Sequence, residues 1–483
     1  MNTSAIVAAV LKSAERYADR IALICGEEKI PYSELVRRAQ SAASHIAKFA
    51  PGEHVGIFLP NSIHFPPHVL GALWAGKIIA VLPTLAPPPL LKLMFAEAKL
   101  TTVFTSPDLA PRLAEAGVPC VLIDPTYPPA NDFAPQTRPH DAAVLLYTSG
   151  TTGRPKAVAL SEQNIISNAE GCREATGFDD RQVMLAILPL FHAYGLTVTN
   201  LLPLMTGSTV VVLERFVPRA VLNAIERHRV TTLVAVPSQY RLLALDPTPC
   251  DASSLWLCIA GAERLPETTE REFTERFGHA ILPGYGATEV APVISLNIPE
   301  TNRPASVGRP LPNLKVTIRS EDDTVCPVGE IGEVCVEGPS VMLGYLNDPE
   351  ATARKIRNGI FHSGDKGFTD ADGYLYLAGR ADEMVKVAGE KVYPAEVENA
   401  LERIEGVEEA AVIALPDQKH GVRLHAFLQK KDGAMLDESM LRAACRELLE
   451  PHKVPRSFTF VDSLPRTITG KTDKRTLTAS AGP

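Results

Sequence analysis

The chain has 483 residues, of which 45% are hydrophobic and 22% charged, a composition typical of ordinary globular proteins. Its net charge of −8 and its lack of a polybasic run argue against nucleic acid or an anionic membrane surface as a main partner. The eight cysteines form no C-x-x-C pair and no Cys/His group with zinc spacing, so we expect free thiols in a reducing compartment.

The N-terminus predicts an amphipathic helix rather than a signal peptide. Its short apolar stretch, Ala5–Leu11, has no basic residue before it, and Lys12 follows at once. The most apolar stretch, Val69–Leu91, is interrupted by Lys77 and by several prolines, so we expect no membrane span. A soluble, cytoplasmic protein is therefore the expectation.

Helical and strand-like segments alternate through the first 120 residues. Apolar residues at helical spacing predict helices over Tyr32–Phe49 and Phe65–Ala75, and short β-type runs cover His54–Leu59 and Ile78–Leu82. This alternation is typical of a parallel sheet covered by helices. The proline-rich stretch Asp124–His140 then predicts a surface linker between two lobes.

A second alternating run predicts a second lobe. Its expected strands and helices are Val183–Leu188, Thr209–Leu213, Val217–His228, Thr232–Val236, Leu255–Ala260 and Glu267–Phe277. After about residue 303, the short strands Val316–Arg319 and Glu333–Glu337 indicate a small β-rich unit.

The last hundred residues have an alternation of their own. Its expected elements are a helix at Pro394–Ile404, strands at Glu409–Leu415 and His425–Gln429, and a helix at Glu438–Leu449. The predicted fold is α/β, with a large N-terminal domain over residues 1–380 and a small C-terminal α/β domain over residues 381–483. The large domain holds two parallel-sheet lobes and the β-rich unit.

The sequence YTSGTTGRPKAV, residues 147–158, has the chemistry of a phosphate-binding loop. It follows the apolar run Ala142–Leu146 and combines glycines, hydroxyls and Lys156. Glycine-rich backbone offers N–H groups to a phosphate, hydroxyls add donors, and a lysine adds a charge. The spacing of Gly150, Gly153 and Lys156 does not match the usual P-loop. A solvated turn is the structural alternative.

Six further segments join this loop in one recognisable order. They are LPLFHAYG (188–195), AGAERLP (260–266), GYGATE (284–289), HSGD (362–365), GRADEMVKVAGEKVYPAEVE (379–398) and PRTITGKTDKRTL (465–477). Together the seven resemble the motifs of the adenylate-forming superfamily, which includes acyl-CoA synthetases, aryl-CoA ligases, firefly luciferase and the adenylation domains of nonribosomal synthetases. The resemblance covers residues from about 15 to 477, nearly the whole chain.

The resemblance implies an ATP site made from these motifs. The residues that would orient the departing pyrophosphate are Thr148, Ser149, Thr151, Thr152 and Lys156. Gly261, Ala262 and Glu263 would form the wall under the adenine, and Tyr285 would stack on its face. Asp365 would accept hydrogen bonds from the ribose diol, and Arg380 would reach the ribose or a phosphate.

It also implies the residues of the reaction itself. Thr288 would bond the α-phosphate, Glu289 would ligate Mg²⁺, and His192 would lie beside the incoming carboxylate. Lys471 would bridge that carboxylate and the α-phosphate. Asp382 would be the hinge on which the C-terminal domain rotates, bringing in Lys471 for adenylation or the segment Ala388–Gly389 as the wall of a thiol tunnel.

The expected function is the ATP-dependent activation of a carboxylic acid to an acyl-adenylate, followed by transfer of the acyl group to coenzyme A. A monomer or homodimer is expected. Amino-acid-activating relatives carry an Asp where this chain has Ala193, which argues against an amino acid. A fatty or aryl acid is favoured because the candidate pocket lacks charge. Its residues are Ala193, Tyr194, Gly195, Val236, Pro237, Ser238, Ala260, Gly284, Val290 and Ala291. The small residues at positions 193, 195, 260, 284 and 291 are expected to leave room for an acyl chain.

Two other functions stay open at this point. The first is a ligase that loads a carrier-protein phosphopantetheine, because the AGEKV form at 388–392 is reminiscent of such ligases. Fatty acyl-AMP ligases of this kind usually carry an insertion before the HSGD-type motif, however, and the compact stretch Val336–His362 shows none. A nucleotide-binding protein with a dead site is disfavoured by the joint presence of the motif residues. The N-terminal lobe is short, and PTLAPPPLLKLM (83–94) is expected to replace the family's usual turn-and-helix segment.

Overall fold

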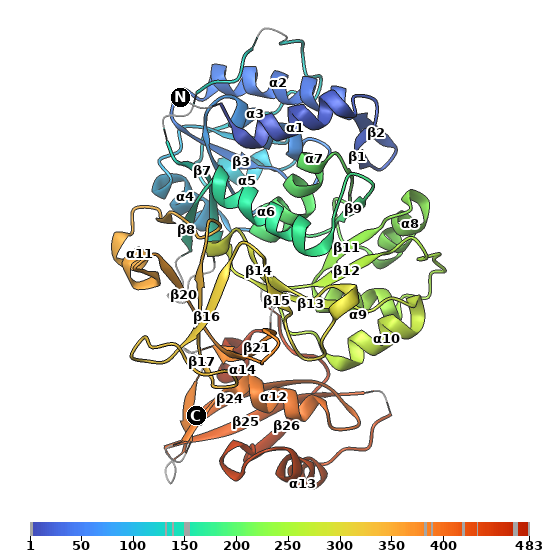
Figure 1. Ribbon diagram of the computed structural model, residues 1–483, viewed down its shortest axis with the longest axis vertical. Helices are drawn as coiled ribbons and strands as arrows, with labels where there is room; N and C mark the ends of the chain where they lie inside the picture. Colours follow the sequence, from blue (N-terminus) through green and yellow to red (C-terminus); the bar gives the residue numbers. More distant parts are fainter. Residues whose placement is uncertain are drawn as a thin grey trace.

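The computed structural model describes residues 3–130, 133–137, 140–148, 155–380, 384–387, 390–417, 421–431, 433–466 and 472–481. Two large mixed sheets, a small antiparallel sheet and a C-terminal unit follow one another along the molecule (Figure 1). The predicted α/β class is confirmed. No helix in the described residues is both long enough and apolar enough to cross a membrane.

The first large sheet has seven strands in the order β18-β8-β7-β4-β3-β5-β6. These are β3 (His54–Phe58), β4 (Ile78–Val81), β5 (Val103–Thr105), β6 (Cys120–Leu122), β7 (Ala142–Thr148), β8 (Lys156–Ser161) and β18 (Gly344–Tyr345). Strands β3 to β7 are parallel to one another. Strand β8 pairs antiparallel with β7, and β18 pairs antiparallel with β8 and forms one edge of the sheet. The sheet therefore ends in a strand from far along the chain.

Helices of the first part of the chain surround this sheet. They are α1 (Ala5–Arg16), α2 (Tyr32–Phe49), α3 (Phe65–Trp74), α4 (Pro88–Glu97), α5 (Ala110–Glu115) and α6 (Glu162–Thr176). The expected helices at α1, α2 and α3 are confirmed. In α2 the buried residues Leu35, Ala39, Ala42 and Ile46 recur at helical spacing, which explains why this element was predictable.

Two expectations about this part of the chain were wrong. The proline cluster does not replace a helix: Pro88 and Pro89 lie in the first turn of α4, where a missing backbone N–H costs no helical hydrogen bond. The stretch from 124 to 140 lies mostly at the surface in its described residues, but it joins β6 to β7 of the same sheet and so does not link two lobes. One of these described residues is buried. Tyr127 is 2% exposed, and its carbonyl accepts a 2.5 Å hydrogen bond from Arg37 of α2.

The second large sheet has nine strands in the order β15-β14-β13-β12-β11-β9-β10-β1-β2. They are β1 (Ile21–Cys25), β2 (Glu28–Pro31), β9 (Val183–Ala186), β10 (Thr209–Val212), β11 (Thr232–Ala235), β12 (Leu257–Ala260), β13 (Leu282–Gly286), β14 (Val293–Leu296) and β15 (Arg309–Pro310). Its helices are the π-helix η1 (Tyr194–Leu201), α7 (Leu202–Thr206), α8 (Pro218–His228), α9 (Pro237–Leu245), α10 (Glu267–Phe277) and the single turn η2 (Thr288–Val290). The expected strands and helices of this run are confirmed to within a few residues.

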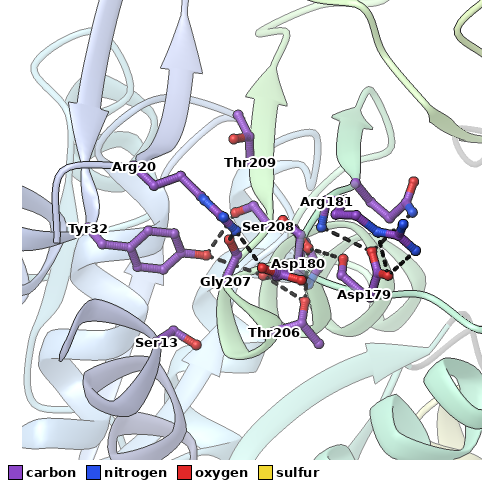
Figure 2. Close-up of polar contacts among 12 residues, drawn as sticks. Ser13, Arg20, Tyr32, Asp179, Asp180, Arg181, Thr206, Gly207, Ser208 and Thr209 are labelled. Carbon is purple, nitrogen blue, oxygen red and sulfur yellow. Dashed lines mark hydrogen bonds and ion pairs between the residues drawn. The ribbon is translucent and has the colours of Figure 1, made fainter. Parts of the chain in front are cut away.

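The N-terminal hairpin β1–β2 belongs to this second sheet although it begins the chain. Figure 2 shows how it is held: the buried Tyr32 hydroxyl donates a 2.7 Å hydrogen bond to the carbonyl of Ser208. Arg20 donates to the carbonyls of Asp180 and Gly207 and pairs with the Asp180 carboxylate at 3.0 Å. Burial raises the pKa of the Tyr32 hydroxyl, so it remains a donor. These contacts hold the hairpin and the start of α2 against the segments that precede β9 and β10 of the same sheet.

The β-rich unit is the expected antiparallel sheet. Its strands are β16 (Lys315–Arg319), β17 (Gly332–Glu337), β19 (Ile356–Arg357), β20 (Ile360–Thr369) and β21 (Leu375–Arg380), with α11 (Pro349–Lys355) beside it. Strand β20 lies between β17 and β21 and carries the HSGD motif.

The C-terminal unit packs around its own apolar cores. Its strands and helices are β22 (Val385–Val387), β23 (Glu390–Val392), α12 (Pro394–Glu402), β24 (Val407–Asp417), β25 (Gly421–Lys430), α13 (Glu438–Leu448), β26 (Ser457–Val461) and α14 (Lys474–Ser480). Strands β24 and β25 are antiparallel, and β26 pairs in parallel with β25. The boundary at residues 380 and 381 stays a prediction, since Asp382 lies outside the described residues.

Ion pairs connect the C-terminal unit to the second large sheet. Arg264 lies 2.6 Å from Glu402, Arg403 lies 3.4 Å from Glu267, and Arg241 contacts Glu408. Burial raises the pKa of the Glu402 carboxyl to about 7, because loss of solvation outweighs the attraction of Arg264.

This pKa predicts a pH-dependent contribution to stability. An accessible glutamate titrates near 4.5, so between that value and about 7 the folded protein holds the Glu402 proton more tightly than the unfolded chain. The free energy of unfolding therefore falls as pH rises through this window. Glu402→Gln should remove this fall and be more stable than wild type above pH 7, by at most about 3 kcal/mol. Urea unfolding at pH 5 to 8 measures the difference. Glu267→Gln, which also loses an interdomain ion pair, is the control, and parallel pH curves for all three proteins would contradict the assignment.

Candidate active site

The predicted phosphate loop connects two adjacent antiparallel strands. Strand β7 ends at Thr148 and β8 begins at Lys156, and these two residues are direct partners across the ladder. Ser149, Thr151 and Thr152 lie outside the described residues, so their roles stay predictions. The structure nevertheless fixes the two ends of the loop on adjacent strands of the first large sheet, with β18 as the edge strand beyond β8.

Lys156 and Glu289 meet at one aromatic ring that the sequence analysis did not single out. The ammonium of Lys156 lies 4.8 Å from the centre of the Tyr345 ring and 3.9 Å from Asp348. The Tyr345 hydroxyl donates a 2.8 Å hydrogen bond to Oε1 of Glu289. Burial and the neighbouring carboxylate raise the pKa of Tyr345, so the hydroxyl stays protonated and donates. The ring thus positions a cation and a carboxylate together.

Backbone pairing explains why Tyr345 lies there. In β18, Tyr345 is opposite Val158 of β8, directly beyond the phosphate loop. The N–H of Met342 donates to the carbonyl of Glu289 at 2.8 Å, which attaches η2 to the same segment. The sequence signal was the stretch GYLND at 344–348, a Tyr and an Asp in a turn, which no simple spacing rule separates from an ordinary loop.

A second group forms between the second large sheet and the small antiparallel sheet. The Tyr285 hydroxyl, at the end of β13, donates a 2.5 Å hydrogen bond to Oδ2 of Asp365 on β20. Arg380 of β21 is the ladder partner of Asp365, and its guanidinium lies 3.4 Å from Oδ1. Burial first, and then Asp365, raises the pKa of Tyr285. The predicted adenine and ribose residues are therefore neighbours.

The two groups are connected through η2. The chain runs from Tyr285 through Gly286, Ala287 and Thr288 to Glu289, so three residues lie between the two side chains that anchor the groups. Thr288 is half-buried between them. Its predicted place at the α-phosphate stays a prediction.

The predicted adenine wall follows β12 as a tight turn. Ala262 has a φ of 71°, in the left-handed region that few L-residues adopt, and its side chain is exposed. The turn exposes backbone, and Glu263 beside it is half-buried. A Cβ on Gly261 would lie 2.8 Å from the Tyr194 ring, so glycine here allows this ring to lie against the turn.

His192 lies immediately before η1. Its ring is half-buried and lies 4.6 Å from the ring of Phe191, centre to centre, and its backbone N–H donates to the carbonyl of Pro189. Ala193, Val290 and Ala291 are buried, as are Pro237 and Ala260, whereas Tyr194 is partly exposed. The partly exposed Tyr194 ring, two residues after His192, lies against the turn at Gly261.

One expectation about the predicted pocket was wrong. Gly195 was expected to leave room for an acyl chain, but the space a Cβ would take is occupied by backbone, with the Pro189 oxygen 2.2 Å away. Gly284 differs, because a Cβ there would make ordinary contacts of 3.4 Å or more with Ser295, Leu296 and Ile259, and its φ is not in the left-handed region.

Comparison with known proteins agrees with this geometry. The family model "AMP-binding enzyme" matches residues 10–346, and "AMP-binding enzyme C-terminal domain" matches residues 396–471. The chain belongs to the AMP-binding enzyme family. Among curated relatives, the sulfoacetate–CoA ligase of Cupriavidus necator is 34% identical over 88% of this chain and 86% of its own length. A feruloyl-CoA synthase of Amycolatopsis is 35% identical over 92% and 93%.

A solved structure of the family superposes over almost the entire molecule. ATP-bound MatB from Rhodopseudomonas palustris has a TM-score of 0.91 at 29% identity and covers 99% of each chain. The adenylate-forming resemblance inferred from the motifs is thereby confirmed. In this AMP-binding enzyme, Lys471 and residues 388–389 lie outside the described residues. Their predicted roles in adenylation and in the thiol tunnel therefore stay predictions.

The short distance between Gly195 and the Pro189 carbonyl can be tested by substitution. Gly195→Ala should lower the free energy of unfolding by about 1–3 kcal/mol, because the new methyl group collides with the Pro189 carbonyl. Gly284→Ala is the matched control, with ordinary contacts only, and should change stability much less. Denaturant unfolding of both variants is the measurement. Equal stability of the two would mean that Gly195 borders open space after all.

Proposed function

We propose that this AMP-binding enzyme activates a fatty or aryl carboxylic acid as an acyl-adenylate and transfers the acyl group to coenzyme A. The general activity, that of an AMP-forming acid–CoA ligase, follows from the family and from relatives named as CoA ligases. The observation that carries the residue assignments is the pair of tyrosine-centred groups on either side of Thr288, one with Lys156 and Glu289 and the other with Asp365 and Arg380.

The proposed reaction has two displacements. A carboxylate oxygen of the acid attacks the α-phosphorus of ATP, the bond to the bridging oxygen breaks, and pyrophosphate leaves. The thiolate of coenzyme A then attacks the acyl carbon, and AMP leaves with the electrons of the mixed anhydride bond. The first step brings two anions together, so fixed cations and donors lower its barrier most. Lys156 would hold the departing pyrophosphate, and Thr288 would donate to the α-phosphate.

Glu289 fits the role of Mg²⁺ ligand. Its carboxylate is a hard oxygen donor, and the hydrogen bond from Tyr345 to Oε1 fixes its orientation. When bound, Mg²⁺ would offset the charge of the phosphates. Tyr345 would thus act as a positioning residue for Glu289, and its protonated hydroxyl suits that role.

The remaining assignments follow the family resemblance. His192 would orient the incoming carboxylate, Tyr285 would stack on adenine with Gly261, Ala262 and Glu263 beneath it, and Asp365 with Arg380 would hold the ribose. Lys471 would join the carboxylate and the α-phosphate. We take residues 381–483 as a mobile C-terminal domain with its hinge at Asp382, in which Ala388–Gly389 would line the thiol tunnel.

The class of acid is argued from the pocket. The two named relatives act on unlike acids, sulfoacetate and ferulate, so relatives alone do not decide it. Ala193 is 3% exposed and Ala260 is 1% exposed, and none of the ten residues predicted to line the pocket is charged, so they offer no partner for an ammonium or a sulfonate. A fatty or aryl acid suits such a pocket.

A panel of acids and acceptors tests the proposal directly. Purified protein would receive ATP, Mg²⁺ and one acid at a time from a series of fatty acids, aryl acids, sulfoacetate and amino acids. The acceptor would be coenzyme A or a holo carrier protein. We expect acyl-CoA with AMP from apolar acids, and little product from amino acids or sulfoacetate, when products are identified by mass spectrometry. Product only on the carrier protein would favour the acyl-AMP ligase that the AGEKV segment suggests, and no adenylate from any acid would favour a dead site.

Lys471→Ala tests the two-step mechanism. Removing a cation that acts in the adenylation transition state should slow acyl-CoA formation from acid and ATP by about 10²–10³-fold. Thioester formation from presynthesised acyl-AMP should survive, because the lysine would then be turned away. Lys474→Ala is the control; that lysine pairs with Glu398 at 2.9 Å within the C-terminal unit. Equal loss of both half-reactions, or loss of neither, would overturn the mechanism.

A further inference from the structure

The β-rich unit contains a cluster of potential metal ligands that the proposed reaction does not use. Strands β17 and β20 place Cys335 directly opposite His362, and Glu333 lies two residues before Cys335 on the same face of β17. The Cys335 sulfur is 3.4 Å from Nδ1 of His362, and Oε2 of Glu333 is 3.3 Å from the same nitrogen. Among the described residues, Glu333, Cys335 and His362 form a group of three potential metal ligands whose ligand atoms all lie within 4.8 Å of one another.

The cluster is built into the protein interior. Cys335 is 0% exposed, the His362 side chain is 4% exposed and the Glu333 side chain is 22% exposed. The other carboxylate oxygen of Glu333 accepts a 2.9 Å hydrogen bond from the N–H of Gly364, which holds Oε2 toward the imidazole. Buried side chains of this kind keep their geometry without a ligand, as a preorganised site requires.

One polar atom of the cluster lacks a hydrogen bond. Nε2 of His362 is buried and has no hydrogen-bond partner in the part of the chain that the structure describes, and its closest charged neighbour is Asp323, 3.9 Å away. A buried imidazole nitrogen normally has a partner. A cation on Nδ1 would fix the tautomer with the proton on Nε2, facing Asp323, which is the usual outer carboxylate of a metal-bound histidine.

We propose that Glu333, Cys335 and His362 bind a thiophilic divalent cation of the zinc class. The spacings of 3.3 and 3.4 Å suit neighbouring ligands of one tetrahedral ion, whose bonds to nitrogen and oxygen are about 2.0–2.2 Å and to sulfur about 2.3 Å. Thiolate, imidazole and carboxylate together select zinc over magnesium or calcium, which prefer oxygen alone. Three protein ligands leave the fourth position to water.

Binding of a cation requires the Cys335 thiol to lose its proton, because the thiolate is the metal ligand. Binding would form a metal–sulfur bond and release that proton to solvent.

The site would stabilise the segment that carries a proposed ATP residue. His362 begins the HSGD motif, and Asp365, three residues later, accepts the hydrogen bond from Tyr285. A cation held between β17 and β20 would tie this segment to the neighbouring strand. We therefore assign it a structural role, separate from Glu289 and from the acid-activation chemistry.

Metal binding to the purified full chain tests the proposal. The protein, stripped of metal with a chelator, would be titrated with Zn²⁺ against a chromophoric chelator and with Co²⁺ in an absorption spectrometer. We expect one ion per chain, a thiolate-to-cobalt charge-transfer band, and a higher thermal unfolding midpoint with Zn²⁺. Cys335→Ala should abolish the band and weaken Zn²⁺ binding by at least about tenfold, and His362→Gln and Glu333→Gln should weaken it by similar factors.

The control is a second buried thiol. Cys445 of α13 is also 0% exposed but lies in an apolar core, so Cys445→Ala should keep the band, the stoichiometry and the rise in the midpoint. If His362→Gln does not fold, Cys335→Ala still decides the question, because it leaves the imidazole in place. Absence of a thiolate band in the wild type, or Zn²⁺ binding that is unchanged in Cys335→Ala, would overturn the proposal.

Discussion

The hydrogen bond from Tyr345 to Glu289 is the contact on which the arrangement of the candidate site depends. It joins an acidic residue of the second large sheet to an edge strand of the first, and Lys156 lies over the same ring. Because hydroxyl and carboxylate are partly shielded from water, this charge-assisted bond is stronger than an exposed one. Through this ring the structure relates the position of Lys156, where β8 begins, to that of Glu289.

The elements that could be predicted from the sequence are those defined by local periodicity. Helices α2 and α10 begin and end at the predicted residues, because their apolar spacing and their ends are local signals. Strand partners were not predictable in this way. The hairpin β1–β2 opens the chain yet completes the second sheet, and β18 follows the second sheet yet completes the first, because pairing over such distances depends on tertiary packing.

The candidate site shows the same division. Tyr285, Asp365 and Arg380 were named from motif order, and the structure brings them together. Tyr345 was missed because one tyrosine in a turn has no distinguishing spacing. Gly195 was misjudged because a small residue next to a pocket looks like room for substrate, whereas the Pro189 carbonyl already occupies that room. His362 was read only as part of a motif, since its partner Cys335 lies 27 residues earlier.

The charged side chains of the candidate site pair with one another within the protein. Arg380 faces Asp365 at 3.4 Å, and Lys156 faces Asp348 at 3.9 Å. Both distances are long and three of the four side chains are at least 30% exposed, so each pair contributes little to stability and costs little to separate. The two tyrosine hydroxyls differ, since each makes a short bond to a carboxylate within the protein. The site therefore combines cations that are easily released to a phosphate with acidic groups that stay fixed, which is the arrangement that an ATP-dependent ligation needs.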